Sequence, residues 1–271
     1  MTDRPVPPSL SLEGAVALVT GAGSRDGIGF AVARALGDLG ARVMLTATSG
    51  RIDQRRRELE GAGIPAAAHQ ADLTDPDQAA VLVQETVARF GTVDIVVNNA
   101  GMVSVTGGFE AGSAQDMAVD TWRRGIARNL DTAFFVTRAA LPHLSGPRGR
   151  IVMVASVTGP VMAMRDEAVY AAAKSGMVGL ARSLAVDLAP RGVTSNAVAP
   201  GWIATASQTD AEAHQAGAVP LQRSATPGEV AAAVAWLCTP GAAYVTGQCL
   251  VVDGGNSVAE ERAAGPRPAG R

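Results

Sequence analysis

The chain has 271 residues, of which 47% are hydrophobic, enough to bury the core of one large α/β domain or two small ones. Its formal net charge of −2 gives no reason to expect a nucleic-acid partner. Cys238 and Cys249 lack the spacing of a metal site or a disulfide framework, residues 1–14 contain no apolar run of signal-peptide length, and no later run reaches membrane-spanning length. We therefore expect a cytoplasmic protein with no metal and no membrane partner.

The N-terminal part predicts a dinucleotide-binding turn. Residues 1–12 are rich in Pro and Ser and are expected to be flexible, whereas residues 15–20 form a short apolar run typical of a buried parallel strand. A glycine-rich stretch, 21–29, follows directly and leads into helical apolar spacing. Glycines allow positive φ and close backbone approach, and free N–H groups at a helix start favour a pyrophosphate. The alternative is a plain tight turn.

The end of the second predicted strand, 42–47, bears on which cofactor is used. Dinucleotide folds that select NAD carry an acid about 20 residues beyond the glycines, where it holds the ribose hydroxyls. This zone contains Thr48 and Ser49 and no carboxylate, while Arg51 and Arg25 could meet a 2′-phosphate. Both arginines could instead be solvated surface charges, and Asp53 keeps NAD open. We favour NADP(H) over NAD(H).

Two further strands bring polar side chains to the same edge. Residues 66–70 predict a third strand that ends near Asp72, which could bond an adenine amino group or cap the turn before Thr74. A helix then reaches Phe90, and residues 94–97 predict a fourth strand. Asn98 closes this strand, where its amide is expected to connect neighbouring strands.

A long helix and a fifth strand follow a polar, Gly-rich segment, 107–120, that we expect to be a loop. The helix is predicted from about Thr121 to His143 and contains Asn129, a poor helix-interior residue. Asn129 could mark a local bend that holds a water, or could be a tolerated surface residue. Residues 150–155 predict the fifth strand, and Ser156 stands at its carboxyl end, where ligands of open α/β sheets bind.

Residues 168–189 predict a helix that carries Tyr170 and Lys174 on one face, one turn apart. The pair could be an acid and the cation that tunes it. Proton transfer by a phenol at neutral pH requires its pKa to fall by ~3 units, worth about 4 kcal/mol, and a nearby ammonium is the usual way to supply much of this. The alternative is a chance spacing on an ordinary helix.

The C-terminal third completes one domain. A sixth strand, 193–198, leads into Pro200 and Gly201; residues 202–220 are expected to be a mobile lid; and a helix, 227–238, precedes a last strand, 248–252. Residues 258–271 are expected to be a disordered tail. No internal repeat or linker interrupts the chain. We predict an α/β single-domain Rossmann fold over residues 13–257, a doubly wound seven-stranded parallel sheet with helices on both faces.

These motifs, taken in order, closely resemble the short-chain dehydrogenase/reductase family over about residues 11–256. The marks are the glycine turn ending at 27–29, Asn-Asn-Ala-Gly at 98–101, Asn129, Ser156, Tyr170 with Lys174, and the segment from Pro200. The ending at 245–255 resembles 3-oxoacyl-[acyl-carrier-protein] reductases and related alcohol dehydrogenases.

The resemblance implies four catalytic residues. Tyr170 would be the general acid in reduction and the base in oxidation, and Lys174 would lower its pKa and bind the nicotinamide ribose. Ser156 would orient the carbonyl or alcohol, and Asn129 would hold a water that links Lys174 to solvent.

The resemblance also implies the residues that meet the cofactor and the substrate. The cofactor residues would be Gly21, Ser24, Arg25, Gly27, Ile28, Gly29, Thr48, Asp72, Leu73, Asn99, Ala100, Gly101, Tyr170, Lys174, Pro200, Gly201, Ile203 and Thr205. The substrate-side candidates are Ser156, Val157, Met162, Met164 and Trp202, although the apolar ones could simply be core. One departure concerns the turn, where five residues lie between Gly21 and Gly27 in place of the family's usual three.

Three functions remain open at this stage. The first is an NADP(H)-dependent reductase of a ketone or 3-oxoacyl group, a small-molecule substrate that could be carrier-linked. Arg148 and Arg191 could attract an acidic carrier protein or a coenzyme A phosphate, or could be ordinary surface charges. The second is an NAD-dependent dehydrogenase of a cyclic or sugar-like secondary alcohol, and the third is a non-catalytic cofactor-binding sensor. The small residues Ala171, Ala172, Ala173 and Gly176 permit close packing, and the resemblance to the family implies that this face meets another subunit in a homo-oligomer, a dimer or tetramer.

Overall fold

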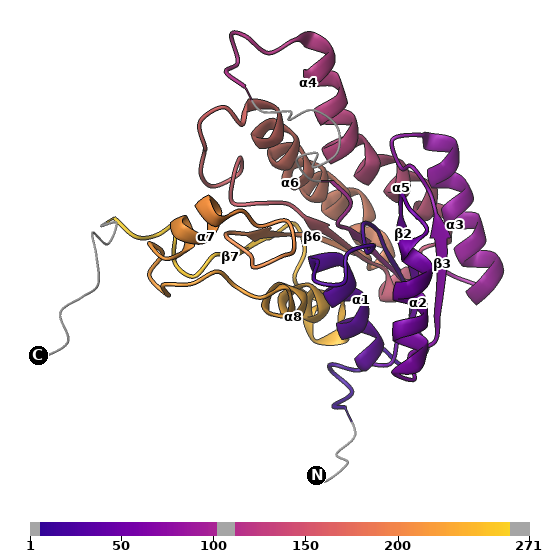
Figure 1. Cartoon of the computed structure of the whole chain (residues 1–271). Coiled ribbons are helices and arrows are strands. Elements are labelled where there is room, and N and C mark those ends of the chain that lie inside the picture. Colours follow the sequence, from indigo (N-terminus) through magenta and orange to yellow (C-terminus); the bar gives the residue numbers. More distant parts are fainter. Residues whose placement is uncertain (1–5, 102–111, 261–271) are drawn as a thin grey trace, which may run out of the picture.

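A computed structural model describes residues 6–101 and 112–260 of the chain. In this part of the chain, seven parallel strands form one sheet in the order β3-β2-β1-β4-β5-β6-β7, which confirms the predicted fold (Figure 1). The strands are β1 Val16–Val19, β2 Arg42–Ala47, β3 Ala66–Gln70, β4 Ile95–Asn98, β5 Arg150–Val154, β6 Thr194–Pro200 and β7 Cys249–Val252.

Helices cover both faces of the sheet (Figure 1). One face packs against α1 Ile28–Asp38, α2 Arg51–Gly61 and α8 Pro227–Cys238, and the other against α3 Pro76–Phe90, α5 Thr132–Ala140 and α6 Ala168–Leu188. The strands feed both cores because successive side chains point to opposite faces: Ala17 and Val19 join the first core, and Leu18 joins the second. This explains why β1 is apolar at every position.

The strand order reverses between β1 and β4, and this places the ligand crevice. β1 pairs with β2 through Val19 and Leu45 on one side, and with β4 through Val19 and Val97 on the other. The chain leaves these two neighbouring strands in opposite directions at their carboxyl ends, where open α/β sheets bind ligands. The glycine turn follows β1 there, and Asn98 ends β4.

The long helix predicted from Thr121 to His143 is present but irregular. It begins as α4 Val119–Ile126, widens into a π-helical turn at Ala127–Asp131, and continues as α5 and a 3₁₀ turn at Leu141–His143. Asn129 lies in the π turn and is buried, so the prediction of a local irregularity is confirmed and the surface alternative is wrong. The predicted loop therefore ends two residues earlier than expected, and residues 102–111 of it lie outside the described residues.

Segments near the two ends and in the expected lid are better defined than the sequence suggested. Leu12 is buried, its N–H donates to Leu39 O, and Ser9 O accepts from Gly241 N, so the described part of the N-terminal segment packs on the domain. The expected lid contains α7 Asp210–Ala216, which starts with a capping box between Thr209 and Glu212. Residues 1–5 and most of the predicted tail, 261–271, lie outside the described part.

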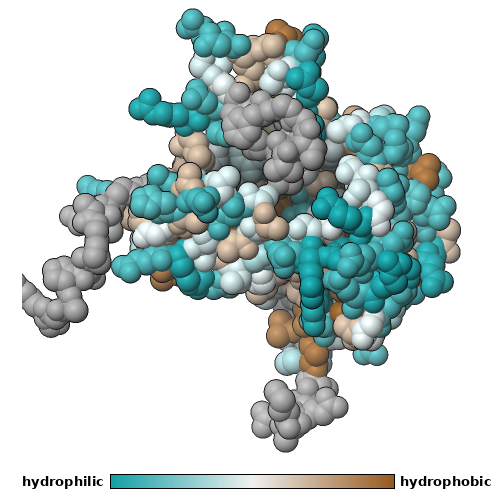
Figure 2. Space-filling model, in the orientation of Figure 1, coloured by the Kyte–Doolittle hydropathy of each residue, from teal (hydrophilic) through white to brown (hydrophobic). Residues whose placement is uncertain are grey.

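The surface of the described residues is mainly hydrophilic on the face shown in Figure 2, with apolar residues in small separate patches. None of the described helices is both long enough and apolar enough to cross a membrane.

Candidate active site

The glycine turn is held against the end of β4 by side chains on both strands. The Thr20 hydroxyl accepts hydrogen bonds from Asn99 N and Ala100 N, and Asn99 Nδ2 donates to the carbonyls of Thr20 and Gly21 at 3.0 and 3.1 Å. Gly21 has a φ of 68°. A Cβ on Gly29 would lie 2.5 Å from Asn99 Nδ2 and 2.6 Å from Gly21 O, so this close approach requires glycine.

The start of α1 fits a pyrophosphate. Gly27 is the N-cap residue with extended backbone, and no side chain caps the helix, which leaves its first N–H groups available for an anion. The two additional residues of the turn are accommodated by a bend in which Gly27 N donates to Ser24 O, while Arg25 and its neighbour Asp26 are exposed. A dinucleotide requires a turn in which no side chain keeps its phosphates from the backbone, next to a helix start with free N–H groups. The glycine turn and the start of α1 together have both features.

The end of β2 presents a guanidinium rather than a carboxylate. Arg51, the first residue of α2, donates from Nε to Ser49 Oγ at 3.3 Å, so it stays beside the strand end. Asp53, the nearest acid, lies 3.7 Å from Arg56 within α2. Gln70 Nε2 donates to Thr48 O, which ties this turn to β3. The local charge therefore suits a phosphate better than two ribose hydroxyls.

Asp72 and Leu73 have structural roles that limit what they can offer a cofactor. Asp72 Oδ1 accepts from Thr74 N and Thr74 Oγ1 at 3.0 and 2.7 Å. These two hydrogen bonds agree with the alternative that Asp72 caps the turn before Thr74. The Leu73 side chain is buried in the core on the α3 side. The adenine contact of Asp72 stays a prediction.

The two asparagines at the end of β4 both connect elements. Asn98 is buried and donates from Nδ2 to Thr137 Oγ1 at 2.8 Å and to Met153 Sδ at 3.4 Å, which confirms its predicted structural role. The cross-link from Asn99 to the glycine turn, and the part played in it by Thr20, were not predicted. The sequence feature that could have indicated this cross-link is the threonine, Thr20, immediately before the first glycine of the turn.

Ser156, Tyr170 and Lys174 come together at the carboxyl edge of the sheet. Lys174 Nζ lies 5.6 Å from the centre of the Tyr170 ring, so both side chains share one face of α6 as predicted. The Lys174 side chain is almost fully buried, and its Nζ donates to Val154 O at 3.1 Å, at the end of β5. Ser156 lies two residues after the end of that strand; its Oγ accepts from Thr158 N at 3.1 Å, and its hydroxyl lowers the pKa of Tyr170.

The electrostatics of the pair differ from the sequence prediction. Burial raises the pKa of Tyr170 above its ordinary value; the Ser156 hydrogen bond opposes this, and the carboxylates of Glu167 and Glu212 add to it. Burial also lowers the pKa of Lys174 to about 8. In the chain alone, the net shift of the Tyr170 pKa is therefore opposite to the expected one, because desolvation dominates and Lys174 Nζ is directed to Val154 O; the effect of Lys174 on the phenol stays a prediction. Glu167 and Glu212 were missed because neither belongs to a motif.

Asn129 lies beside the cofactor side of the crevice. Its Nδ2 donates to Gly125 O at 3.2 Å, and its buried Oδ1 has no hydrogen-bond partner among the described residues. A Cβ on Gly101, whose φ is 121°, would lie 3.0 Å from this Oδ1. An unpaired buried carbonyl oxygen is suited to accept a hydrogen bond from a water, and the water-holding role of Asn129 stays a prediction.

The segments after β6 and β5 form the opposite wall. Pro200 ends β6 and Gly201 N donates to Val252 O, while Ile203 is buried beside Ala225 and its carbonyl accepts from Thr205 N. Among the substrate-side candidates, Val157 is buried and its N–H donates to Pro200 O. Its burial agrees with the alternative that Val157 is simply a core residue.

The remaining substrate-side candidates lie nearer the surface. Met162 and Trp202 are half-buried, and Met164 is 46% exposed. Their contact with a substrate stays a prediction.

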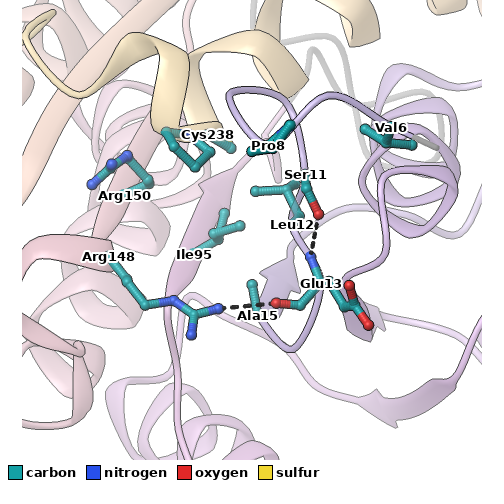
Figure 3. Close-up of a pocket in the computed structure, with 11 residues that line it drawn as sticks. Val6, Pro8, Ser11, Leu12, Glu13, Ala15, Ile95, Arg148, Arg150 and Cys238 are labelled. Atoms are coloured by element: carbon teal, nitrogen blue, oxygen red, sulfur yellow. Dashed lines mark hydrogen bonds between the residues drawn. The ribbon is translucent and has the colours of Figure 1, made fainter.

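The two arginines considered for an acidic carrier lie at the opposite end of the sheet. Arg148 donates to Glu13 O at 3.2 Å beside a cavity of about 510 Å³ lined by Leu12, Ile95 and Cys238 (Figure 3). Arg191 donates to Leu141 O and Leu144 O. Both guanidinium groups thus bind backbone carbonyls at the amino-terminal edge, and none of the predicted catalytic residues lines this cavity.

Comparison with known proteins agrees with this geometry. A family model described as enoyl-(acyl carrier protein) reductase matches residues 21–257. The Vibrio cholerae 3-oxoacyl-[acyl-carrier-protein] reductase FabG is 39% identical over 251 residues, 91% of this chain and 98% of that protein. The cis-4-hydroxycyclohexanecarboxylate dehydrogenase of Sinomonas cyclohexanicum is 38% identical over 245 residues, 89% of this chain and 95% of that protein.

A solved structure of a short-chain dehydrogenase is also similar to this chain. The short chain dehydrogenase from Burkholderia cenocepacia J2315, in complex with NADP, matches with a TM-score of 0.82 at 33% identity, over 90% of this chain and 98% of that chain. These similarities agree with the fold, with the glycine turn beside an uncapped helix start, and with the cluster of Ser156, Tyr170 and Lys174. The chain therefore belongs to the short-chain dehydrogenase/reductase family of oxidoreductases.

Proposed function

We propose that this protein is an NADP(H)-dependent oxidoreductase that reduces a ketone or 3-oxoacyl group to a secondary alcohol, or catalyses the reverse reaction. The observation that carries the proposal is the meeting of Ser156, Tyr170 and Lys174 at the same sheet edge as the glycine turn. A hydroxyl, a phenol and an ammonium can together polarise and protonate a carbonyl oxygen without a metal.

The proposed mechanism assigns one task to each side chain. A bound nicotinamide cofactor supplies or accepts the hydride. The Ser156 hydroxyl donates a hydrogen bond to the substrate oxygen and fixes its position. Tyr170 transfers its phenolic proton to that oxygen as the hydride arrives at carbon, so the carbonyl gains one hydride and one proton. The Lys174 ammonium, close to the ring, then stabilises the phenolate until Tyr170 is reprotonated. Asn129 would hold the water that completes the path to solvent.

The cofactor preference is supported by charge at the end of β2. Arg51 lies beside Ser49, Arg25 is exposed in the glycine turn, and Asp53 is near Arg56. The NADP complex of the Burkholderia relative is consistent with this preference. Guanidinium groups bind a 2′-phosphate well and gain nothing comparable from a ribose hydroxyl.

The second candidate is a dehydrogenase of a cyclic secondary alcohol. It is favoured by one comparison, the relative whose name states activity on cis-4-hydroxycyclohexanecarboxylate. The reductase is placed first because the name of FabG states a 3-oxoacyl substrate. A panel of 3-oxoacyl esters, simple ketones and cyclic alcohols, run with NADPH and with NADH, separates the two candidates.

The mechanism is tested by Tyr170→Phe. We expect at least a 1,000-fold loss of turnover, on the order of what loss of a general acid costs, because no other group would protonate the substrate oxygen. Cofactor affinity, measured by fluorescence titration, should change little. Activity close to that of the wild type would remove Tyr170 from the mechanism, and loss of both activity and cofactor binding would indicate a structural role.

Two further properties belong to the same proposal. We infer a homo-oligomer, but the small residues on α6 do not all face outward: Ala173 is buried, and a Cβ on Gly176 would lie 2.8 Å from Leu130. Ala172 and Gly179 remain on the open face of the helix. Cytoplasmic location and a carrier-linked substrate also remain proposals.

A further inference from the structure

Backbone hydrogen bonds continue the pairing of β5, β6 and β7 into the residues that follow the strands. Val157 N donates to Pro200 O at 2.9 Å, and Gly201 N donates to Val252 O at 3.0 Å. Asp253 comes directly after β7, and a Cβ on Gly201 would lie 2.8 Å from Asp253 Cβ. The chain after β7 therefore packs on the segment after β6, which is itself bonded to the segment after β5.

The carboxylate of Asp253 folds residues 253–257 into a tight turn, the Asp253 turn. Its Oδ1 accepts from Gly255 N at 2.9 Å, and its Oδ2 accepts from Ser257 N at 2.6 Å. The two glycines inside the turn have positive φ, 65° for Gly254 and 87° for Gly255. One side chain thus fixes the direction in which the chain leaves the sheet, through two charge-assisted hydrogen bonds.

The Asp253 turn also contacts two segments that are distant in the sequence. Asn256, which is buried within the turn, donates from Nδ2 to Met162 Sδ at 3.7 Å. Leu221 N donates to Gly254 O at 3.2 Å, which attaches the chain that follows α7. The turn therefore connects the segment after β5 with the segment after α7.

Met162 closes a second turn, which begins at Ser156. Its N–H donates to Val157 O at 2.8 Å, and its carbonyl accepts from Gly159 N at 2.7 Å. Within this turn, Thr158 N donates to Ser156 Oγ at 3.1 Å. Because the amide approaches the hydroxyl oxygen as a donor, the Ser156 proton is directed elsewhere and remains available to a substrate oxygen.

These contacts form one continuous path from Asp253 to Ser156. The carboxylate fixes the Asp253 turn, and Asn256 in that turn holds Met162. Met162 in its place closes the turn whose amide orients the Ser156 hydroxyl. We propose that Asp253 is a positioning residue that acts through Ser156 and sets the orientation in which this hydroxyl meets the substrate. The inference rests on the proposed function, since it takes Ser156 to be the group that holds the substrate oxygen.

A double-mutant cycle tests this path. Asp253→Ala keeps the Cβ beside Gly201 and removes both hydrogen bonds of the turn. We expect kcat/KM for the carbonyl substrate to fall about 10-fold or more, since misplacing a reacting group by about 1 Å can cost on the order of 100-fold. In a Ser156→Ala background the same substitution should cost almost nothing further, because the hydroxyl that it positions is gone. Losses that simply multiply in the double variant overturn the proposal.

The matched control is Asp94→Ala, at the amino edge of the sheet. Asp94 is buried, and its Oδ2 also accepts from a backbone N–H, that of Val16, at 2.9 Å. Its loss should lower the melting temperature, but its effect on kcat/KM should be small and independent of Ser156→Ala. If Asp94→Ala couples to Ser156→Ala as strongly as Asp253→Ala does, the coupling reports a general loosening of the fold and the proposal fails.

Asn256→Leu interrupts the path at its second step and leaves the Asp253 carboxylate in place. This variant also keeps the proposal testable if Asp253→Ala does not fold. It should lower kcat/KM by about 3-fold or more, the value of one hydrogen bond, and this loss should again disappear in the Ser156→Ala background. Undiminished kcat/KM in Asn256→Leu overturns the path through Met162.

A measurement without turnover separates this inference from the proposed function. The chain has eight methionines, so labelling their methyl groups with ¹³C gives a spectrum in which Met162→Leu identifies the Met162 resonance. Asp253→Ala and Asn256→Leu should both shift that resonance, and Asp94→Ala should not.

The two proposals then fail in different ways. If no ketone or 3-oxoacyl compound is reduced with either cofactor, the proposed function fails, and the Met162 resonance still tests the path from Asp253. If reduction occurs, but Asp253→Ala matches the wild type in kcat/KM and in the Met162 resonance, only the present inference fails.

Discussion

Lys174 is a charged side chain that is almost fully buried in a core of parallel strands and helices. Its one backbone hydrogen bond, to Val154 O, does not replace the water that an ammonium loses, which is why its pKa falls to about 8. The proposed chemistry nevertheless needs the charge there. Residues that serve function at a cost in stability are common in active sites.

Lys174→Met should therefore stabilise the protein while abolishing turnover. The folded state releases the lysine proton near pH 8 and the unfolded state near 10.5, so the unfolded state binds more protons between these values and wild-type stability should rise with pH in that window. The variant should lack this rise and be more stable at pH 7 by about 1–3 kcal/mol. Urea unfolding at several pH values measures both effects, and a less stable variant at pH 7 contradicts the argument.

Arg51 offers a second test at the scale of the residue. Arg51→Ala should weaken NADPH binding by about 10-fold or more, the value of a charge-assisted hydrogen bond, and leave NADH binding nearly unchanged. Arg57→Ala is the control, since Arg57 is also exposed on α2 and has no assigned role. Equal losses for both cofactors, measured by fluorescence titration, would mean that Arg51 does not meet a 2′-phosphate.

At the scale of the element, the glycine turn and the end of β4 behave as one unit. Thr20 and Asn99 join them through four hydrogen bonds. The turn is consequently held in place before any ligand arrives, so little ordering cost remains for binding. This unit also explains why Gly29 tolerates no side chain.

Gly29→Ala should destabilise the protein by about 1–3 kcal/mol, the usual cost of overpacking, and reduce cofactor affinity. The new Cβ would meet Asn99 Nδ2 and the Gly21 carbonyl, both of which are fixed. The control is Gly228→Ala in the first turn of α8, where the nearest atom is 3.8 Å away and alanine should be neutral or slightly stabilising. Thermal unfolding and cofactor titration give the two readouts; unchanged behaviour of Gly29→Ala would mean that the turn adapts.

At the scale of the whole molecule, the two edges of the sheet have different roles. The carboxyl edge gathers the glycine turn, Ser156 and the catalytic pair. At the amino edge, Arg148 donates to Glu13 O (Figure 3), and Arg191 donates to Leu141 O and Leu144 O. In a single chain, a carrier guided by these two arginines would therefore dock at the far edge from the chemistry.

Assembly can be tested on the open face of α6. A Cβ on Gly179 would meet no atom within 4 Å, so Gly179→Arg should fold normally and, if this face lies between subunits, should give a smaller species in light scattering. Gly61→Arg, in an equally open position at the end of α2, should leave the size unchanged. An oligomer of unchanged size in Gly179→Arg would exclude this face as the interface.

The parts of the site that sequence could predict are those set by local geometry. Tyr170 and Lys174 share a face because residues four apart on a helix are neighbours. Ser156 stands at a strand end because the apolar run stops there. The direction of the Tyr170 pKa shift was wrong because it depends on burial and on Glu212, more than 40 residues away. The contacts of Thr20 with Asn99 are equally nonlocal, and a helical pattern alone does not reveal the extra residue in the turn around Asn129.

That π turn has a consequence for how the two halves of this long helix can vary. Each residue of an α-helix advances by about 100°, so one residue gained in the π turn rotates the sides of α4 relative to those of α5. The Asn98 bond to Thr137 anchors α5 to the sheet, whereas Val119 and Trp122 on α4 are exposed. We expect substitutions at these two exposed positions to leave the anchored helix undisturbed, whereas the end of α4 is fixed, because Gly125 O accepts from Asn129 Nδ2 and a Cβ on Gly125 would lie 2.5 Å from Val169.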